Sequence, residues 1–477
     1  MRDASGLLGR VVLASAVALI AGCATTVQGT PVSIFADPYR VAGMPAVDGD
    51  TGLRPDASGP VRVVLGTDGG ETDEFGRTAI SDIEEFWDTA YGETFDGEFT
   101  PVAGVLSWDS DGVNTAFCGG DTVGVVNAGY CGSENTIGWD RGVLMPSLRE
   151  ANGDMGVTMV LAHEYGHAVA DQAGIAADDT PTLVSEQQAD CLAGAYMRWV
   201  AEGRSPRFTL STGDGLNSVL SAMIAFRDPL MNEGDFAVGD DEHGSAFERV
   251  SAFQFGFTDG APACAAIDEA EVEQRRGDLP VLLPADESGE LAIDEGSIRG
   301  FADAMEVLFE PADPPELSFA TGGTDCRDSK SRDPAVYCPA DNTVAVDLAA
   351  LQELSTPSEE GDLATGDNSA YSVVVSRYAL ALQRERGVTL DTAQAALRTA
   401  CLTGVATAKM ASPVTTPDGN SIVITAGDLD EAVSGLLTNG FAASDVNGAT
   451  VPSGFSRIDA FRIGVLGDED RCFSRFA

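Results

Sequence analysis

Residues 160–169 read VLAHEYGHAV and contain two of the three histidines of the chain, His163 and His167. On a helix, positions i and i+4 leave the same face, so both imidazoles can bind one tetrahedral zinc ion. Glu164 lies between them and points close to the open coordination position, where a carboxylate can act as a base. We therefore predict a metal centre on this helix. The alternative is a surface helix whose histidines have no joint role.

A second helix is predicted in residues 182–196, TLVSEQQADCLAGAY, and Glu186 and Asp190 share one of its faces. A catalytic zinc has three protein ligands and an open fourth position. We predict that Glu186 is the third ligand and that Asp190 orients an imidazole. An acidic, solvated helix face is the alternative. Cys191 is not expected to be a ligand, because helical geometry turns it about 100° away from Asp190.

These residues carry a resemblance to a known family. The motif HEYGH at 163–167, EQQADCLAG at 186–194 and HGSAFERV at 243–250 together resemble the putative neutral zinc metallopeptidase family within the zincins. More narrowly, they resemble lipoprotein peptidases of actinobacterial envelopes. The resemblance implies a strand near residues 135–143 that edges the substrate cleft. It also implies the following roles: zinc binding by His163, His167 and Glu186, catalysis by Glu164, and a hydrogen bond between the His163 ring and the Asp190 carboxylate.

The remaining histidine, His243, is predicted to donate a hydrogen bond in the transition state. In the gluzincin-like arrangement a distant histidine faces the zinc and stabilises the oxyanion of the tetrahedral intermediate. A purely structural histidine is the alternative.

The cysteines indicate an internal duplication. Apart from Cys23, the two sets differ by 208, 207, 210 and 208 positions, and neighbouring residues such as Tyr130 and Tyr337 recur with them. We predict an α+β protein of two tandem zincin-like domains, residues 58–275 and 276–477. The two sets are Cys118, Cys131, Cys191 and Cys264, then Cys326, Cys338, Cys401 and Cys472.

The second domain is predicted to have lost the metal site. Alignment through Gly174 and Gly387 places residues 376–380, SRYAL, opposite 163–167. Alignment through the cysteines places Ala396, Ala400 and Val451 opposite Glu186, Asp190 and His243. We therefore expect one zinc ion per chain, in the first domain. The second domain covers the first, binds a partner, or is an inert relic retained for stability; the sequence leaves these open.

The first 22 residues are predicted to be an export signal. Their apolar run, residues 11–20, is too short to span a bilayer as a helix. LIAGC at 19–23 resembles the bacterial lipobox, which implies that Cys23 carries a lipid that anchors the protein to the outer face of the cytoplasmic membrane. A plain secretory signal is the alternative. Residues 23–57, rich in Pro, Gly, Asp, Thr and Ala, are predicted to be a flexible tether.

Disulfides persist outside the cytoplasm, so four cysteines per domain favour two bridges per domain. Four cysteines allow three pairings. The pairing that we favour is Cys118–Cys131 and Cys191–Cys264, and likewise Cys326–Cys338 and Cys401–Cys472.

The 477 residues include 75 acidic and 28 basic side chains, a formal net charge of −47. Such a surface repels nucleic acid, which excludes a nucleic-acid partner. The prediction is a cell-envelope zinc peptidase that acts on peptide or protein substrates. Two alternatives remain: a non-catalytic envelope protein that binds peptides or cell-wall material, and a metallohydrolase that acts on a cell-wall amide. The sequence indicates no oligomeric state.

Overall fold

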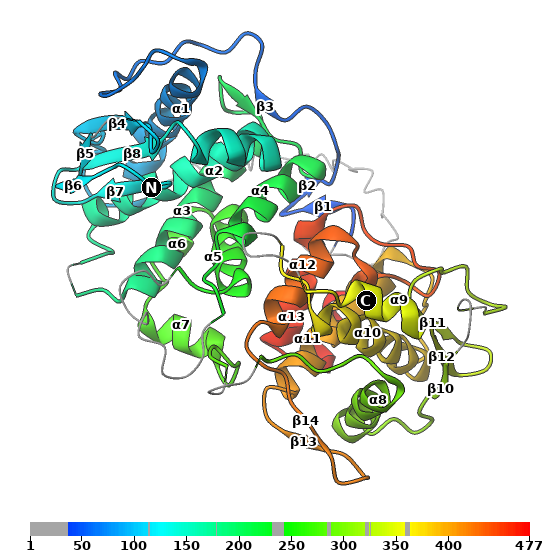
Figure 1. The fold of residues 1–477 in the computed structure, drawn as a ribbon. Coiled ribbons are helices and arrows are strands. Elements are labelled where there is room, and N and C mark those ends of the chain that lie inside the picture. The colour runs from blue at the N-terminus through cyan, green and yellow to red at the C-terminus, as the bar shows by residue number, and fades with distance from the viewer. Residues whose placement is uncertain are drawn as a thin grey trace, which may run out of the picture. The chain divides into compact units, whose positions relative to one another are not determined.

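Helices carry most of the architecture, and two three-stranded sheets lie at separate places along the chain (Figure 1). The computed structural model describes residues 37–112, 115–177, 179–230, 243–283, 288–319, 324, 326–357 and 363–477. The α+β class expected from the sequence is confirmed. The predicted signal peptide, Cys23 and residues 23–36 of the predicted tether lie outside the described residues.

The first part of the chain holds seven helices and nine strands within the described ranges. They are β1 (Arg40–Val41), β2 (Met44–Pro45), β3 (Gly52–Leu53), α1 (Glu71–Thr94), β4 (Gly104–Trp108), β5 (Ala116–Phe117), β6 (Gly120–Asp121), β7 (Ala128–Cys131), β8 (Thr136–Asp140), α2 (Leu144–Ala173), α3 (Thr182–Ala201), β9 (Phe208–Thr209), α4 (Asp214–Ala225), α5 (Ala246–Asp259), α6 (Ala261–Cys264) and α7 (Glu269–Arg276).

The second part continues with a similar mixture of elements. They are α8 (Glu295–Phe309), β10 (Glu316–Phe319), β11 (Ala335–Cys338), β12 (Thr343–Val346), α9 (Leu348–Leu354), α10 (Asp367–Glu385), α11 (Ala393–Lys409), β13 (Val414–Thr415), β14 (Ser421–Ile422), α12 (Asp428–Thr438), the short 3₁₀ helix η1 (Phe441–Ala443), α13 (Gly454–Val465) and α14 (Glu469–Arg475).

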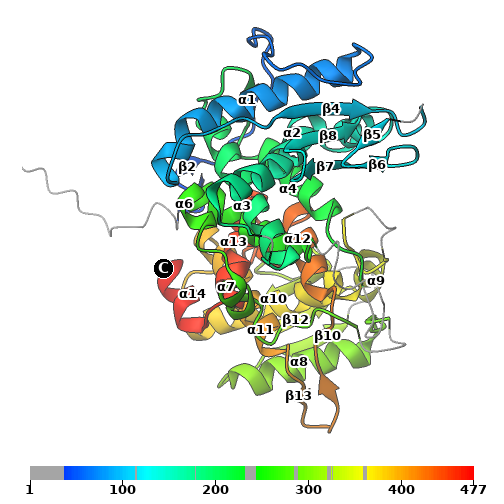
Figure 2. The same cartoon turned by 90° about the vertical axis from the view of Figure 1, so that its left-hand side faces the viewer.

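The larger sheets have three strands each and the same topology. In the order β4-β8-β7, β8 is central, parallel to β4 and antiparallel to β7. In the order β10-β12-β11, β12 is central, parallel to β10 and antiparallel to β11. Helix α1 runs along the first sheet (Figure 2), where the fully buried Trp139 of β8 donates a hydrogen bond to Asp73. Helix α2 packs against β7 and β8.

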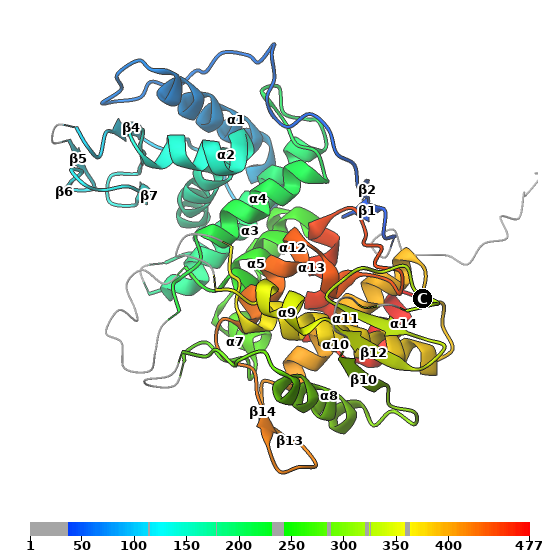
Figure 3. The same ribbon diagram turned by 45° about the vertical axis from the view of Figure 1, so that its right-hand side comes forward.

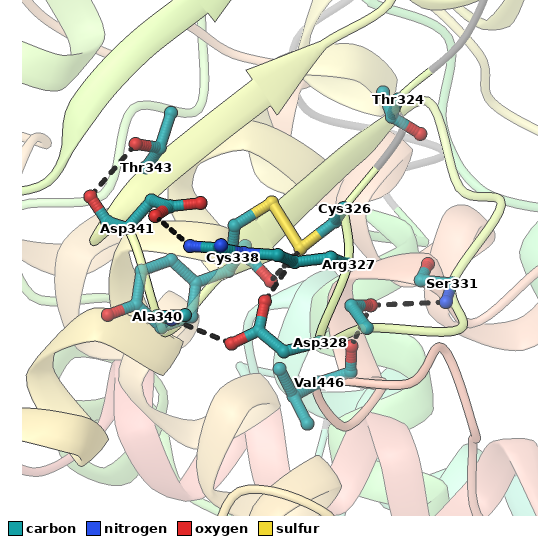
Figure 4. The surroundings of a disulfide bond; sticks show 12 residues. Thr324, Cys326, Arg327, Asp328, Ser331, Cys338, Ala340, Asp341, Thr343 and Val446 are labelled. Carbon is teal, nitrogen blue, oxygen red and sulfur yellow. Dashed lines mark hydrogen bonds and ion pairs between the residues drawn. A yellow bond between two sulfur atoms is a disulfide. The ribbon is translucent and has the colours of Figure 1, made fainter.

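Four disulfides link neighbouring elements, with the pairing that the sequence analysis favoured. They are Cys118–Cys131, Cys191–Cys264, Cys326–Cys338 and Cys401–Cys472. The third joins the loop before β11 to the last residue of that strand (Figure 4). Next to it, the Asp328 carboxylate accepts a hydrogen bond from the amide of Ala340, which ties the same loop to the turn after β11.

Residues 37–57 are not a flexible tether, which corrects the prediction for that part of the segment. Strand β3 pairs with β9, and the Arg54 side chain donates hydrogen bonds to the carbonyl oxygens of Ser205 and Phe208. Val41 is fully buried. Composition suggested flexibility, but these contacts join residues about 150 positions apart and leave no local signal in the sequence.

The two parts of the chain contact each other through helices. α12 and α13 pack against α4 and α5 (Figures 1 and 3). Gln254 of α5 donates a hydrogen bond to the carbonyl oxygen of Phe455 and accepts one from Arg462. The amide of Gly454 donates to Asn217 of α4.

Candidate metal centre

The two predicted histidine ligands lie on α2, beyond a kink at Gly153, where φ is 69°. A left-handed backbone of this kind favours glycine. His163 and His167 are one turn apart, and their Nε2 atoms lie 3.3 Å from each other. The helix therefore presents both imidazoles to the same point, as the spacing in the sequence predicted.

Gly166, between the histidines, allows α3 to approach α2 closely. A Cβ atom at this position would lie 2.8 Å from the carbonyl oxygen of Ala189 and 2.9 Å from its Cα. A side chain larger than hydrogen would therefore separate the helices. The close crossing brings Glu186 and Asp190, which lie on either side of Ala189 on α3, up to the two histidines.

Glu186 completes a group of three ligand atoms. Its Oε2 lies 3.1 Å from Nε2 of His163, and its Oε1 lies 3.2 Å from Nε2 of His167. A tetrahedral zinc ion with bonds of about 2.05 Å holds its ligand atoms about 3.3 Å apart. The 3.3 Å separation of the two Nε2 atoms matches that geometry, each Glu186 oxygen lies at a similar distance from one imidazole, and one ligand atom from each of the three residues lies within 4.8 Å of the others. Oε2 is also buried without a hydrogen-bond partner among the described residues, a cost that a bound cation offsets. The residues therefore fit a zinc ion.

A buried ion pair lies behind His163. Nδ1 of His163 is 2.7 Å from Oδ1 of Asp190, which leaves Nε2 for the metal. The Arg249 side chain, on α5, donates two hydrogen bonds to the same carboxylate, of 3.0 and 2.8 Å. Burial raises the pKa of Asp190, but the charges of Arg249 and His163 outweigh it and lower this pKa below its usual value. Asp190 is thus held ionised.

The electrostatics of the group favour a positive charge at its centre. Burial alone lowers the pKa of the His163 ring, but Asp190 and Glu186 raise it to about 10. Burial raises the pKa of Glu186, yet its contacts with His163 and His167 lower it well below the usual value. Two carboxylates around two imidazoles thus stabilise a cation, either a proton or a metal ion.

Glu164 and the ligand group line one cleft of about 810 Å³. A volume of this size is typical of a ligand site. The Glu164 side chain is half-buried, and its carboxylate has no hydrogen bond or ion pair within the described part of the chain. It is therefore available to accept a proton from a group bound in the cleft.

The strand at the edge of this cleft is β7, not the strand near residues 135–143 that the resemblance implied. Asn127 to Tyr130 line the cleft, whereas β8 is the central strand of its sheet and has neighbours on both sides. The prediction was wrong because β8 gains its second neighbour from β4, about 30 residues earlier in the chain. Local sequence does not reveal such pairing.

His243 lines the same cleft and is held by Asp228. Its backbone amide donates a 3.0 Å hydrogen bond to Oδ1 of Asp228, and its Nδ1 lies 3.4 Å from the same atom. This contact raises the pKa of the His243 ring, although burial opposes the shift. The ring is about half exposed, so it can meet a substrate.

The residues aligned with the metal site in the second part of the chain lie in packed interior. Residues 376–380 are buried on α10. Arg377, opposite Glu164, donates hydrogen bonds to Ser444 and to the carbonyl oxygen of Phe441. Ala396, Ala400 and Val451 are fully buried as well. None of these side chains supplies a metal ligand.

Three residues with no predicted role also support the site. Arg249 holds Asp190, and Asp228 holds His243. Ser185 lies with its Oγ 3.4 Å from Nδ1 of His167. Arg249 stands in the HGSAFERV motif that carried the resemblance, so the sequence offered a signal for it. The sequence offered no such signal for Asp228 or Ser185, because the contacts of these two residues depend on how distant segments pack.

Comparison with known proteins agrees with this geometry. Residues 18–267 match the family described as "Putative neutral zinc metallopeptidase". The uncharacterized protein YpfJ of Escherichia coli K12 is 29% identical over 151 residues, which are 28% of this chain and 51% of YpfJ, and YpfJ of an E. coli O6:H1 strain matches equally. The match thus spans about half the length of these relatives. No solved structure shows significant similarity. Because the family match covers more than half of the chain, the protein belongs to the putative neutral zinc metallopeptidase family.

Proposed function

We propose that the protein is a zinc-dependent peptidase whose single metal is bound by His163, His167 and Glu186. The observation that carries the proposal is the 3.3 Å separation of the two imidazole Nε2 atoms, with one Glu186 oxygen 3.1 Å from the first and the other 3.2 Å from the second, combined with the free carboxylate of Glu164 in the same cleft. When bound there, zinc is a Lewis acid that lowers the pKa of a water ligand toward about 7 and polarises a carbonyl group.

The chain's own residues supply the proton transfers and the positioning. Glu164 accepts a proton from the attacking water on its carboxylate and returns it to the nitrogen of the departing amine. His243, whose ring pKa is raised by its contact with Asp228, donates a hydrogen bond to the oxyanion of the tetrahedral intermediate. Asp190 and Arg249 fix the orientation of His163.

The test combines metal analysis with peptide digestion. Wild-type protein is expected to bind one zinc per chain and to cleave an unstructured peptide library, with loss of cleavage in a chelator. Glu164→Gln should keep the zinc and lose at least about 100-fold of the rate. Zinc binding without cleavage by the wild type would favour an envelope binding protein. Cleavage of peptidoglycan fragments but not of peptides would favour a cell-wall amide as substrate.

We also propose that the chain contains two copies of one fold. Support comes from the shared topology of the two three-stranded sheets and from Asn135 and Asn342, which have the same left-handed φ of 47°. The same close helix crossing occurs twice. A Cβ atom on Gly256 would lie 1.7 Å from the carbonyl oxygen of Cys191, and one on Gly464 would lie 1.8 Å from that of Cys401.

The proposed location is the outer face of the cytoplasmic membrane, through a lipid on Cys23. The support is the sequence LIAGC alone, since these residues lie outside the described part of the chain. Among the described helices, none is long and apolar enough to cross a membrane. Mass spectrometry of the purified mature protein tests the proposal, since it predicts an acylated cysteine at the N-terminus.

A further inference from the structure

A second, smaller cavity adjoins the metal cleft. Its volume is about 240 Å³, and Tyr130 and Asp171 line both cavities. Cavities that hold a whole small molecule usually measure about 300 Å³ or more. The side cavity is therefore of a size for one side chain of a longer substrate that also occupies the cleft.

The walls of the side cavity are partly apolar and partly polar. Phe99, Val102, Tyr165 and Ala168 form the apolar part, and Thr100, Asn135 and Gln172 add polar groups. The Tyr165 hydroxyl is already occupied, since it accepts a hydrogen bond from the Val102 amide and donates one to Glu84. Such walls suit the methylene groups of a long side chain.

Asp171 is the one charged residue that lines the side cavity, among the residues that the structure describes. Its side chain is exposed, and Oδ2 accepts a 3.1 Å hydrogen bond from the Tyr130 hydroxyl. It forms no ion pair with the described residues. A carboxylate without a cationic partner, in a cavity that the aromatic rings of Phe99 and Tyr130 also line, is a favourable environment for a substrate cation.

The position of Asp171 relative to the metal ligands suits a peptide. Asp171 follows His167 by four residues on α2, which corresponds to a rise of about 6 Å. In an extended peptide, two residues span about 6.7 Å, and their side chains point to the same side. When one side chain of an extended substrate lies at the metal, the side chain about two residues further along the substrate therefore reaches the side cavity.

We propose that the side cavity is a subsite for a lysine- or arginine-like side chain of the substrate, with its methylene groups against Phe99 and Val102 and its charge at Asp171. The inference rests on the proposed peptidase function and names its substrate class. The net charge of −47 agrees with it, because such a field attracts cationic peptides. An acidic side chain would be repelled, and a neutral one would gain only the apolar contacts.

The test uses blocked ten-residue peptides in which one lysine is moved along an otherwise uncharged sequence, and a matched series with norleucine. For at least one lysine position, the wild type should show a kcat/KM about five- to tenfold above that for norleucine. Asp171→Asn should abolish the difference. Asp88→Asn, a matched loss of one exposed carboxylate on α1, should leave it unchanged.

A binding experiment separates this inference from the proposed function. In the Glu164→Gln background, the affinity for the best lysine peptide should fall about five- to tenfold with Asp171→Asn and not with Asp88→Asn. Equal treatment of lysine and norleucine by the wild type, or a lysine preference that survives Asp171→Asn, would overturn the subsite. If lysine peptides bind through Asp171 but no peptide is cleaved by the wild type, the subsite stands and the peptidase proposal fails.

Discussion

Asp430, on α12 in the second part of the chain, accepts a hydrogen bond from the backbone amide of Phe247 in the first turn of α5. The carboxylate is buried and also lies 3.7 Å from the Arg227 guanidinium. Helix α5 carries Arg249, which holds Asp190 and through it His163. The second part of the chain thus contacts the elements that orient a predicted zinc ligand.

Asp430→Ala should therefore weaken the metal centre as well as the fold. Loss of the acceptor leaves a buried amide unsatisfied, which costs roughly 2–3 kcal/mol of unfolding free energy. We expect a lower melting temperature and a weaker zinc affinity, measured by thermal unfolding and by competition with a chelator. Asp88→Ala, at an exposed position on α1, is the control. A variant with lower stability but unchanged zinc affinity would show that the contact serves the fold alone.

Gly166→Ala tests the close crossing of α2 and α3. The added methyl group would lie 2.8 Å from the carbonyl oxygen of Ala189, so α3 must shift by several tenths of an ångström and move Glu186 away from the histidines. We expect zinc affinity to fall at least about tenfold. Gly435→Ala is a suitable control, because a methyl group on this helical glycine of α12 meets no atom within 4 Å. Unchanged zinc affinity in Gly166→Ala would mean that the crossing tolerates the methyl group without displacing Glu186.

The helix that carries His163 and His167 could be predicted because its ligands are one turn apart, and α3 could be predicted from the shared face of Glu186 and Asp190. Both inferences need only local helical geometry. The predicted ligand role of Glu186 already required the two helices to meet, but the sequence did not show that Gly166 and Ala189 form the close approach.

What could not be predicted depends on pairing between distant segments. β7 rather than β8 edges the cleft because β4 occupies the other side of β8. Residues 37–57 are ordered because β3 pairs with β9. The support of α5 by Asp430 joins residues 183 positions apart. Propensity and composition describe each segment by itself and do not report such contacts.

Asp190→Asn should weaken zinc binding while preserving the fold. An amide can still contact Nδ1 of His163, but it lacks the charge that orients the ring and that pairs with Arg249. We expect the zinc affinity to fall about 10- to 100-fold, measured by chelator competition at pH 7.5. Arg249→Lys keeps the charge but loses the paired hydrogen bonds, so its affinity should lie between those of wild type and Asp190→Asn. Wild-type affinity in Asp190→Asn would show that the carboxylate does not tune the site.

A group of carboxylates in the second part of the chain predicts an unusual dependence of stability on pH. Carboxylate oxygens of Glu290, Asp367 and Glu431 lie within 4.8 Å of one another. Burial, together with Asp428, Glu290 and Asp367, raises the pKa of Glu431 to about 9. The folded state therefore binds more protons than the unfolded state between about pH 4.5 and pH 9, and the free energy of unfolding falls as pH rises through this range.

Glu431→Gln should remove the part of that dependence that comes from Glu431, whereas Asp428 and Asp367, whose pKa values burial also raises, keep theirs. The glutamine carbonyl can still accept the hydrogen bond from the Asn368 amide, but the side chain at position 431 no longer has a proton to lose. At pH 8 the variant should be more stable than wild type, by an amount on the order of a few kcal/mol. Near pH 4.5, where the wild-type side chain is protonated, the two should be nearly equal. Urea unfolding between pH 4.5 and pH 9 measures both curves, and parallel curves for the two proteins would contradict the raised pKa of Glu431.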